Sequence, residues 1–586
     1  MKHKLLLGAA LATMLVGCTN VEDPTDGQKP GETGDGYIAV RLNLPTQKGS
    51  RANDVFDDGT LNEYQVNNAA LVLFCGTQES SATFVGAYKL GDFELPEDVS
   101  DNPNQITTSY IAVQEVSSFA KGQNDHVYAL VLVNYDGVAS INGTNLTMGT
   151  VTTTAGTTTI SDLVAATTDH AFYNTVLTNN FFMTNAPLST LAGGTSNPAS
   201  ASLFTLADLG TAPFQATKAA AHKAPAGVIN VERAVAKASL VCDVTATTIP
   251  ADHEIDQLTV ESVEWVLDNC EKNSYFIRNL DGKFDTWKSY KNTTSNTYRM
   301  VGSNPISTGE AAHRTYWCVD PNYATDLADA QKATRGAFVA KDKVQYCHEN
   351  TFDVAHMTHK NTTRAILKIT YSKNGTTGDL YVLAGDNTHI YTDYDNEILP
   401  TLKAYLAGNP TIVGKYAGLA PGTDITSGIT LTTSKADGKA TVTDIVLGDV
   451  DGVTPTALDA AEVTALCAEV NAFHPVTYYA DGVAYHEVYF KHFGDDDAKW
   501  TAPSADEAAA NTVTGAYGDP VSESEYLGRW GMVRNNWYQL EITAINNIGY
   551  ATIPEVTDIP DDNNSKWIGV QIRVLSWAKR SQEETL

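Results

Sequence analysis

Alternation of hydrophobic and polar positions recurs along this chain and predicts β-strands. The first clear case is residues 37–44, YIAVRLNL, in which Ile38, Val40, Leu42 and Leu44 share one face and Ala39, Arg41 and Asn43 share the other. This pattern indicates a half-buried strand, and Pro45 ends it. Further strands are expected at 70–74, 127–134, 181–184, 237–244, 260–267, 365–371, 441–447, 484–490 and 537–542. Because Thr-, Asn- and Gly-rich runs separate them, the sequence predicts a mainly β fold.

Helical spacing is rarer. Apolar residues recur near a helical period over residues 456–470, which is the best helix candidate. A short helix is also expected at 231–237 or just before it, where charged residues and Ala cluster. The architecture that fits is two tandem β-sandwich domains of transthyretin-like or immunoglobulin-like type, covering 52–235 and 236–560. Insertions enlarge the second domain.

The N-terminal residues 1–18, MKHKLLLGAALATMLVGC, have the organisation of an export signal. Lys2 to Lys4 form a basic start, and an apolar stretch of about a dozen residues follows, too short to span a bilayer. The stretch ends at Cys18 in a sequence that resembles the bacterial lipoprotein box, in which the Cys is lipidated. An ordinary signal peptide with a chance Cys is the alternative. Residues 19–36 are rich in Pro, Gly, Asp and Glu, which is typical of a flexible tether.

Composition excludes some classes of function. The chain of 586 residues has 39 Lys and Arg against 69 Asp and Glu, a formal net charge of −30. Such a surface repels phosphate backbones, so nucleic-acid binding is not expected. With 42% hydrophobic residues the chain can build cores, so global disorder is excluded.

Motifs for catalysis or metal binding are mostly missing. There is no nucleophile elbow, phosphate loop or dinucleotide fingerprint, and His486 and His492 have the wrong spacing for a shared metal. We expect these histidines to be partly exposed on a strand, and the acidic runs at 449–451 and 495–497 to be solvated turns. Apart from Cys18, six cysteines are scattered, so one or two disulfides are possible with unreadable pairing. We therefore expect no catalytic residue, cofactor or metal site.

The two ends of the chain carry matching patterns. Residues 568–574 repeat the alternation of residues 38–44, with Ile568, Val570, Ile572 and Val574 on one face. Burying four aliphatic side chains contributes roughly 6–12 kcal/mol before ordering costs. Either segment could be an ordinary strand of its own domain or a strand that fills a groove in a sheet. Between the first strand and the body lies an exposed polar loop that contains Lys48 and Arg51 and is open to proteolysis.

Several segments spread over the chain resemble one family. They are the lipobox at Cys18, YIAVRLNLPTQKGSR at 37–51, VYALVLVN at 127–134, FFMTNAPL at 181–188, VERAVAKASL at 231–240, YCHENTF at 346–352, GRWGMVRNNWYQLEITAI at 528–545 and VQIRVLSWAKR at 570–580. With these segments in this order, the chain resembles a Bacteroidia-type fimbrillin, in particular the major subunits of the short (Mfa-type) fimbriae, which build type V pili.

The resemblance implies a maturation mechanism. Such subunits are exported as lipoproteins, here acylated with palmitate at Cys18, and reach the outer membrane. A trypsin-like protease then cuts after a basic residue, by similarity between Arg51 and Ala52, with Lys48 as the alternative. Removal of the segment that includes strand 37–44 opens a groove, and the C-terminal segment 561–586 of a neighbouring subunit fills it. The implied plug is Ile38, Val40, Leu42 and Leu44, and the implied donor is Ile568, Val570, Ile572 and Val574, with Trp577 anchoring the register.

The same resemblance implies partners and location. The partners are other copies of the chain, accessory pilus subunits and the protease, and the location is the outer membrane and then a surface fimbria that supports adhesion and biofilm formation. Trp530, Trp537 and Tyr538 are expected in the core near the donor strand. The chain exceeds the usual family length through insertions after residue 270, which leaves a shaft or an accessory role open.

Two other classes remain. A surface glycan-binding lipoprotein would keep its N-terminal strand and present tryptophans on one face. An exported hydrolase would need two carboxylates in a cleft.

Overall fold

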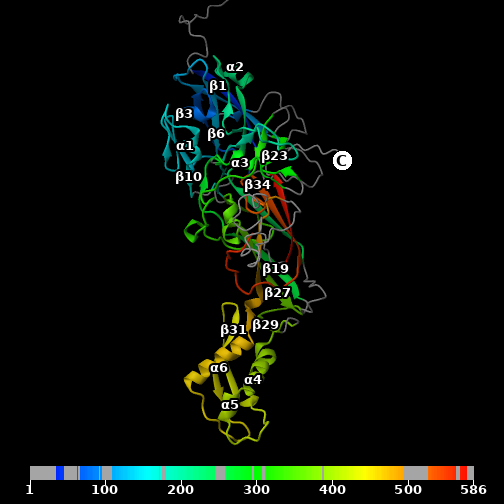
Figure 1. Ribbon diagram of the computed structural model, residues 1–586. Coiled ribbons are helices and arrows are strands. Elements are labelled where there is room, and N and C mark those ends of the chain that lie inside the picture. The colour runs from blue at the N-terminus through cyan, green and yellow to red at the C-terminus, as the bar shows by residue number, and fades with distance from the viewer. Residues whose placement is uncertain are drawn as a thin grey trace, which may run out of the picture.

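The computed structural model describes residues 35–44, 63, 66–91, 93–94, 108–169, 172–174, 180–244, 258–280, 282–292, 296–306, 311–385, 389–493, 526–561 and 568–576. The mainly β fold is confirmed, because most elements are strands in several sheets. The molecule is elongated, with strand β1 and its neighbours at one end and a lobe containing the longest described helices at the other (Figure 1).

A nine-stranded sheet forms the N-terminal end. Its order is β3 (Thr83–Leu90), β2 (Ala69–Gly76), β6 (His126–Val133), β13 (Met183–Asn185), β17 (Gly227–Arg233), β1 (Gly36–Leu44), β5 (Thr108–Val116) and β4 (Phe93–Glu94), and β16 (Ala207–Asp208) also pairs with β6. The small sheet β7 (Ala139–Asn142), β8 (Asn145–Met148) and β9 (Val151–Thr152) packs on the same core. Helices α1 (Ile160–Val164) and α2 (Lys218–Lys223) also belong to this end.

Two further sheets pack over a shared core in the middle of the molecule. One has the order β26 (Gln345–Cys347), β18 (Ala236–Cys242), β34 (Asn536–Ile545) and β35 (Ile568–Ser576). The other has the order β25 (Val339–Ala340), β19 (Leu258–Asp268), β27 (Arg364–Lys373) and β28 (Thr376–Thr377), and β33 (Val483–Tyr489) also pairs with β27. Inward residues of both, such as Leu540 and Leu367, belong to one buried cluster, as in a β-sandwich.

The far lobe has a core of its own. It contains the sheet β29 (Leu380–Leu383), β32 (Val476–Tyr479), β31 (Lys439–Leu447) and β30 (Ile429–Ala436), with helices α4 (Leu399–Ala407), α5 (Pro410–Lys415) and α6 (Ala460–Phe473). Helix α6 is the one predicted over 456–470. It begins later because Asp459 accepts hydrogen bonds from the backbone amides of Ala461 and Glu462 and so caps it.

The remaining strands and α-helix are short. They are the sheet β15 (Leu203–Phe204), β14 (Leu188–Ser189), β24 (His313–Thr315) and β23 (Val301–Pro305), the pairs β10 (Thr167–Thr168) with β20 (Ser274–Tyr275), β11 (Tyr173–Asn174) with β12 (Asn180–Phe181) and β21 (Lys291–Asn292) with β22 (Thr297–Tyr298), and helix α3 (Phe284–Trp287).

The helix expected at 231–237 is wrong for that range, although α2 lies just before it. Strand β17 ends at Arg233 and β18 begins at Ala236, so these residues carry the chain from one sheet to the next. The charged residues that suggested a helix are buried: Glu232 pairs with Arg278, and Lys237 pairs with Glu63.

Candidate functional site: the two terminal strands and their seam

Strand β1 lies inside its sheet. Its nine residues pair antiparallel with β5, from Gly36 opposite Val116 to Leu44 opposite Thr108. On its other edge, Val40 to Asn43 pair in parallel with residues 227–230 of β17. Hydrogen bonds between Tyr37 and Gln215, 2.8 and 2.9 Å long, fasten its start. The strand therefore has hydrogen-bonded neighbours on both edges.

Both faces of β1 are covered. Ile38, Val40 and Leu42 are at most 1% exposed and belong to the main core of this end. Ala39, on the face expected to meet solvent, is also buried, because Ala221 of α2 and Ile111 of β5 cover it. Burial of the three aliphatic side chains alone contributes about 5–9 kcal/mol. Strand β1 cannot leave without exposing a long apolar slot.

Strand β1 also joins two parts of the sheet. In the described sheet, β5 and β4 connect to the other strands through β1. Strand β17 pairs with β13 over residues 231–233 and with β1 over residues 227–230. Removing β1 would thus leave the edges of β5 and β17 open, and these edges form the two sides of the slot.

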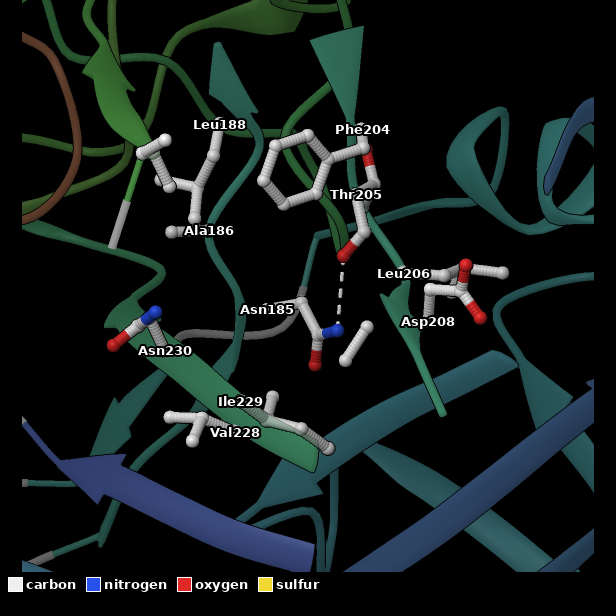
Figure 2. A pocket seen from close by; sticks show the side chains of 13 residues that line it. Asn185, Ala186, Leu188, Phe204, Thr205, Leu206, Asp208, Val228, Ile229 and Asn230 are labelled. Carbon is white, nitrogen blue, oxygen red and sulfur yellow. Dashed lines mark hydrogen bonds between the residues drawn. The ribbon is translucent and has the colours of Figure 1, made fainter. Parts of the chain in front are cut away.

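A pocket of about 410 Å³ adjoins β17 beside this slot (Figure 2). Leu188, Phe204 and Val228 form apolar walls. Asn185 lies at its centre and donates from Nδ2 to the carbonyl oxygens of Thr205 and Ala129, both at 2.9 Å. The amide side chain thereby joins β6 to the segment before β16, where the backbone ladder is interrupted.

Strand β35 differs from β1 because it is an edge strand. It pairs antiparallel with β34, from Asn536 opposite Ser576 to Ile545 opposite Ile568, with a bulge between Ile542 and Ala544. In the described part of the chain β34 is its sheet neighbour. The expected donor residues Ile568, Val570, Ile572 and Val574 thus lie along their own chain's sheet.

The aromatic residues of β34 reach two cores. Trp537 is 6% exposed, belongs to the N-terminal core and donates from Nε1 to the Ser239 hydroxyl at 2.7 Å. Tyr538 is fully buried in the central core, and its hydroxyl accepts from the backbone amide of Val533 at 2.8 Å. Both residues are therefore buried beside β35, whereas Trp530 is half-buried in a separate cluster.

A buried carboxylate lies where the N-terminal sheet meets the central sheets. Glu63 is 1% exposed, and the ammonium group of Lys237 lies 2.9 and 3.1 Å from its two carboxylate oxygens. The Tyr346 hydroxyl donates to the same carboxylate, and Arg233 Nε donates to the Glu63 carbonyl oxygen at 2.6 Å. The Lys237 ammonium also lies 3.7 Å from the centre of the Trp537 ring. We call Glu63, its three direct partners and Trp537 the Glu63 cage.

Further buried ion pairs lie at the boundary between the N-terminal and central sheets, which we call the seam. Arg278 contacts both carboxylate oxygens of Glu232 at 2.9 and 2.7 Å, and Arg534 contacts those of Glu349 at 2.5 and 3.0 Å. Arg314 donates to the carbonyl oxygens of Arg534 and Asn535. Burial, helped by the nearby Arg278 charge, lowers the pKa of Arg314 to about 10. These pairs hold the junction in one arrangement, because breaking one leaves a buried charge without its partner.

The expectation of partly exposed histidines is wrong. His486 and His492 are 1% and 4% exposed, because both lie against aromatic residues of the central core. His492 Nδ1 lies 2.7 Å from the Tyr538 hydroxyl, and His486 Nε2 lies 3.3 Å from the Tyr371 hydroxyl. Burial lowers the pKa of His486 to about 4 and that of His492 to about 3. Both are therefore neutral core residues.

Buried acids lie near the same core. Asp320 accepts hydrogen bonds from the backbone amides of Asn322 and Thr351 at 2.8 and 2.7 Å, and burial raises its pKa to about 8.

Within the described ranges no group of three or more His, Cys, Asp or Glu residues could hold a metal ion. No helix among the described residues is long and apolar enough to cross a membrane.

Several expected residues lie outside the described ranges. They are Cys18, Lys48, Arg51, Ala52 and Trp577, together with the acidic run 495–497. The cysteines Cys75, Cys242, Cys270, Cys318, Cys347 and Cys467 are free thiols. Among the tryptophans whose burial the structure describes, Trp265, Trp287, Trp317 and Trp537 are buried and Trp530 is half-buried. These five tryptophans do not form an exposed face.

Sequence reasoning missed the parallel neighbour of β1, the cover that α2 provides and the Glu63 cage. The spacing of Thr217 and the following KAAAHK run is a usable signal for α2, because Thr217 caps the helix. Nothing in the sequence around Glu63 distinguishes it from an exposed acid.

One comparison with known proteins matches the C-terminal part of the chain. Residues 516–583 match the family model described as "Major fimbrial subunit protein type IV, Fimbrillin, C-terminal". The match includes β34 and β35, and it confirms the fimbrillin resemblance for this segment. Among curated proteins there is no significant match.

Solved structures from Parabacteroides and Bacteroides species align with 58% to 94% of the chain. A candidate cell adhesion protein from Parabacteroides distasonis ATCC 8503 is 9% identical, with 94% of this chain and 99% of that chain covered and a TM-score of 0.35. One from Bacteroides eggerthii DSM 20697 is 11% identical over 94% and 98%, with a TM-score of 0.32. A fimbrial assembly protein from P. distasonis is 11% identical over 58% and 82%, with a TM-score of 0.26. With TM-scores this low, these similarities do not by themselves define the fold of this chain.

Proposed function

We propose that this chain is a structural subunit of a cell-surface fimbria. It is exported as a lipoprotein through Cys18, cut after Arg51 or, alternatively, Lys48, and polymerised by exchange of strands between copies. The polymer supports adhesion and biofilm formation. The fimbrillin match over residues 516–583 supports the subunit role.

The observation that carries the exchange step is the position of β1. It is an interior strand that lies between β5 and β17. Its last residue, Leu44, precedes Arg51 by only seven positions. A cut after Arg51 leaves β1 held by noncovalent contacts alone. Its loss exposes hydrogen-bonding edges and an apolar slot, so a replacement strand is strongly favoured.

The C-terminal strand is suited to be that replacement. Strands β35 and β1 both have nine residues, and β35 repeats the aliphatic alternation of β1. As an edge strand, β35 gives up one ladder of hydrogen bonds when it leaves β34 and gains two in the slot. Exchange between copies is head-to-tail and therefore gives an open filament. The chain from residue 52 on keeps 33 basic and 64 acidic residues, and this excess of acid opposes lateral association at low salt.

Limited trypsin digestion of the chain without its signal peptide tests the proposal. We expect an early cut after Arg51 or Lys48, identified by N-terminal mass analysis, followed by ladders of oligomers and filaments in electron micrographs. Resistance of the loop, or a cut without any change in assembly, would return β1 to an ordinary structural role.

A further inference from the structure

In the sequence, Glu63 lies between the expected cut and β2, the first strand of the remaining body. Glu63 is twelve residues after Arg51 and six residues before β2 begins at Ala69. After a cut at Arg51, this stretch becomes the leading end of the chain and loses its covalent link to β1. Any fixed position for it must then come from contacts of its own.

Glu63 supplies such contacts to elements that stay in place. Arg233 ends β17, Lys237 belongs to β18, and Tyr346 belongs to β26, so the partners come from both the N-terminal and the central sheets. None of these partners belongs to β1. The cage therefore does not depend on the strand that is released.

A second set of contacts follows directly. The backbone amide of Asn67 donates to Asn134 Oδ1 at 2.8 Å, and the backbone amide of Tyr135 donates to Asn68 Oδ1 at 2.9 Å. Asn134 itself has a φ of +55°, in the left-handed region that Asn tolerates. These bonds place residues 67 and 68 at the end of β6. Both bonds are part-buried, whereas the ion pair at Glu63 is fully buried.

We infer that Glu63 is a positioning residue that anchors the leading end of the chain to the seam once β1 has been released. The inference rests on the proposed function, since it needs the cut after Arg51. The anchor confines strand exchange to residues before Glu63. It keeps β2, an interior strand that pairs with both β3 and β6, in the sheet while the slot beyond β6, β13 and β17 is empty.

Hydrogen–deuterium exchange before and after trypsin cleavage tests the anchor. In the wild-type chain we expect the cut to leave exchange at residues 66–71 unchanged. In Glu63→Ala we expect the cut to raise exchange there roughly tenfold or more, because the leading end then has lost both β1 and its buried partner. A merely structural role would raise exchange equally in the cut and the uncut variant.

Two further variants keep the test decisive. Glu63→Gln retains an acceptor for Lys237 and Tyr346 and serves if the Ala variant fails to fold; we expect a smaller increase in the same direction. Glu79→Gln is the matched control, because Glu79 follows β2 and accepts from the backbone amides of Thr205 and Leu206 at 2.8 and 3.0 Å. We expect no cut-dependent change at 66–71 in that variant.

The outcomes separate the inference from the proposed function. A loop that resists trypsin overturns both. A cut that releases the β1 peptide but leaves exchange at 66–71 the same in wild type and both Glu63 variants overturns the anchor alone.

Discussion

The two terminal strands have the same length and the same aliphatic alternation, yet they occupy opposite kinds of position. Strand β1 has a neighbour on each edge and is covered on both faces, whereas β35 lies at the edge of its sheet. Loss of an interior strand breaks the pairing on both of its edges and divides the sheet. Loss of an edge strand breaks one pairing and leaves the other strands of the sheet paired. The difference teaches that pattern alone does not assign a role to a strand; its number of neighbours does.

The largest expected effect comes from keeping β1 covalently attached. The double substitution Lys48→Ala with Arg51→Ala should leave β1 in its slot and abolish filaments, while the monomer folds normally. Electron microscopy and N-terminal mass analysis measure this. Normal filaments from the double variant would contradict the maturation step.

A charge placed in each strand compares the two positions directly. Val40→Asp buries an unpaired carboxylate in the core and should destabilise the subunit by about 3–5 kcal/mol. Val570→Asp in β35 should leave a folded subunit that cannot donate its strand. Thermal unfolding and filament formation measure the two effects, and Ile572→Asp should repeat the second. Filaments formed by Val570→Asp would mean that another segment is the donor.

Breaking the seam should have an intermediate effect. Arg534→Met removes the partner of the buried Glu349 and should lower the free energy of unfolding by roughly 3–5 kcal/mol. Because Arg534 lies two residues before β34, we expect β35 to exchange deuterium faster than β1. The surface variant Lys343→Met, whose ion pair with Asp342 is exposed, is the control and should change stability very little. Equal loosening of both strands would show that the seam does not act preferentially on the donor side.

The smallest effect should come from pH. The pKa of His492 is about 3 in the folded chain, because burial and the charges of Arg314, Arg278 and Arg299 oppose its protonation, against 6.5 ordinarily. Its contribution to stability is therefore complete above pH 6.5 and is lost as pH falls toward 3. Since His492 contacts Tyr538 of β34, acid should speed exchange in β34 and β35 before it affects β1. His492→Gln should reduce this difference, and an identical pH profile for both strands would contradict it.

The sequence predicted strands well at 37–44, 127–134 and 365–371, because their apolar residues directly reflect burial. It did not predict which strands become neighbours. Asn43 of β1 donates to Asn230 of β17 across 187 positions of sequence, and no local pattern contains that information. The terminal strands of the candidate site were recognised from their matched pattern and from the family resemblance.

Buried charge was the second failure of prediction. Charged residues normally indicate surface. The cluster that contains Glu232 and Lys237 predicted a short helix at 231–237 or just before it, and no pattern pointed to Glu63. Their burial depends on partners such as Arg278 and Tyr346, which come from distant parts of the chain. The prediction that His486 and His492 are partly exposed was wrong for the same reason, since their hydroxyl partners lie in other strands.

The far lobe offers a practical use of this architecture. Its turn at Asp451 and Gly452 has φ values of +47° and +78°, is exposed and meets no other atom where a side chain on Gly452 would point. The lobe has its own core and lies at the opposite end of the molecule from β1 (Figure 1). A foreign peptide inserted at this turn would be displayed once per subunit along a polymer joined through the terminal strands, so the chain could serve as a scaffold for ordered, repetitive epitope presentation.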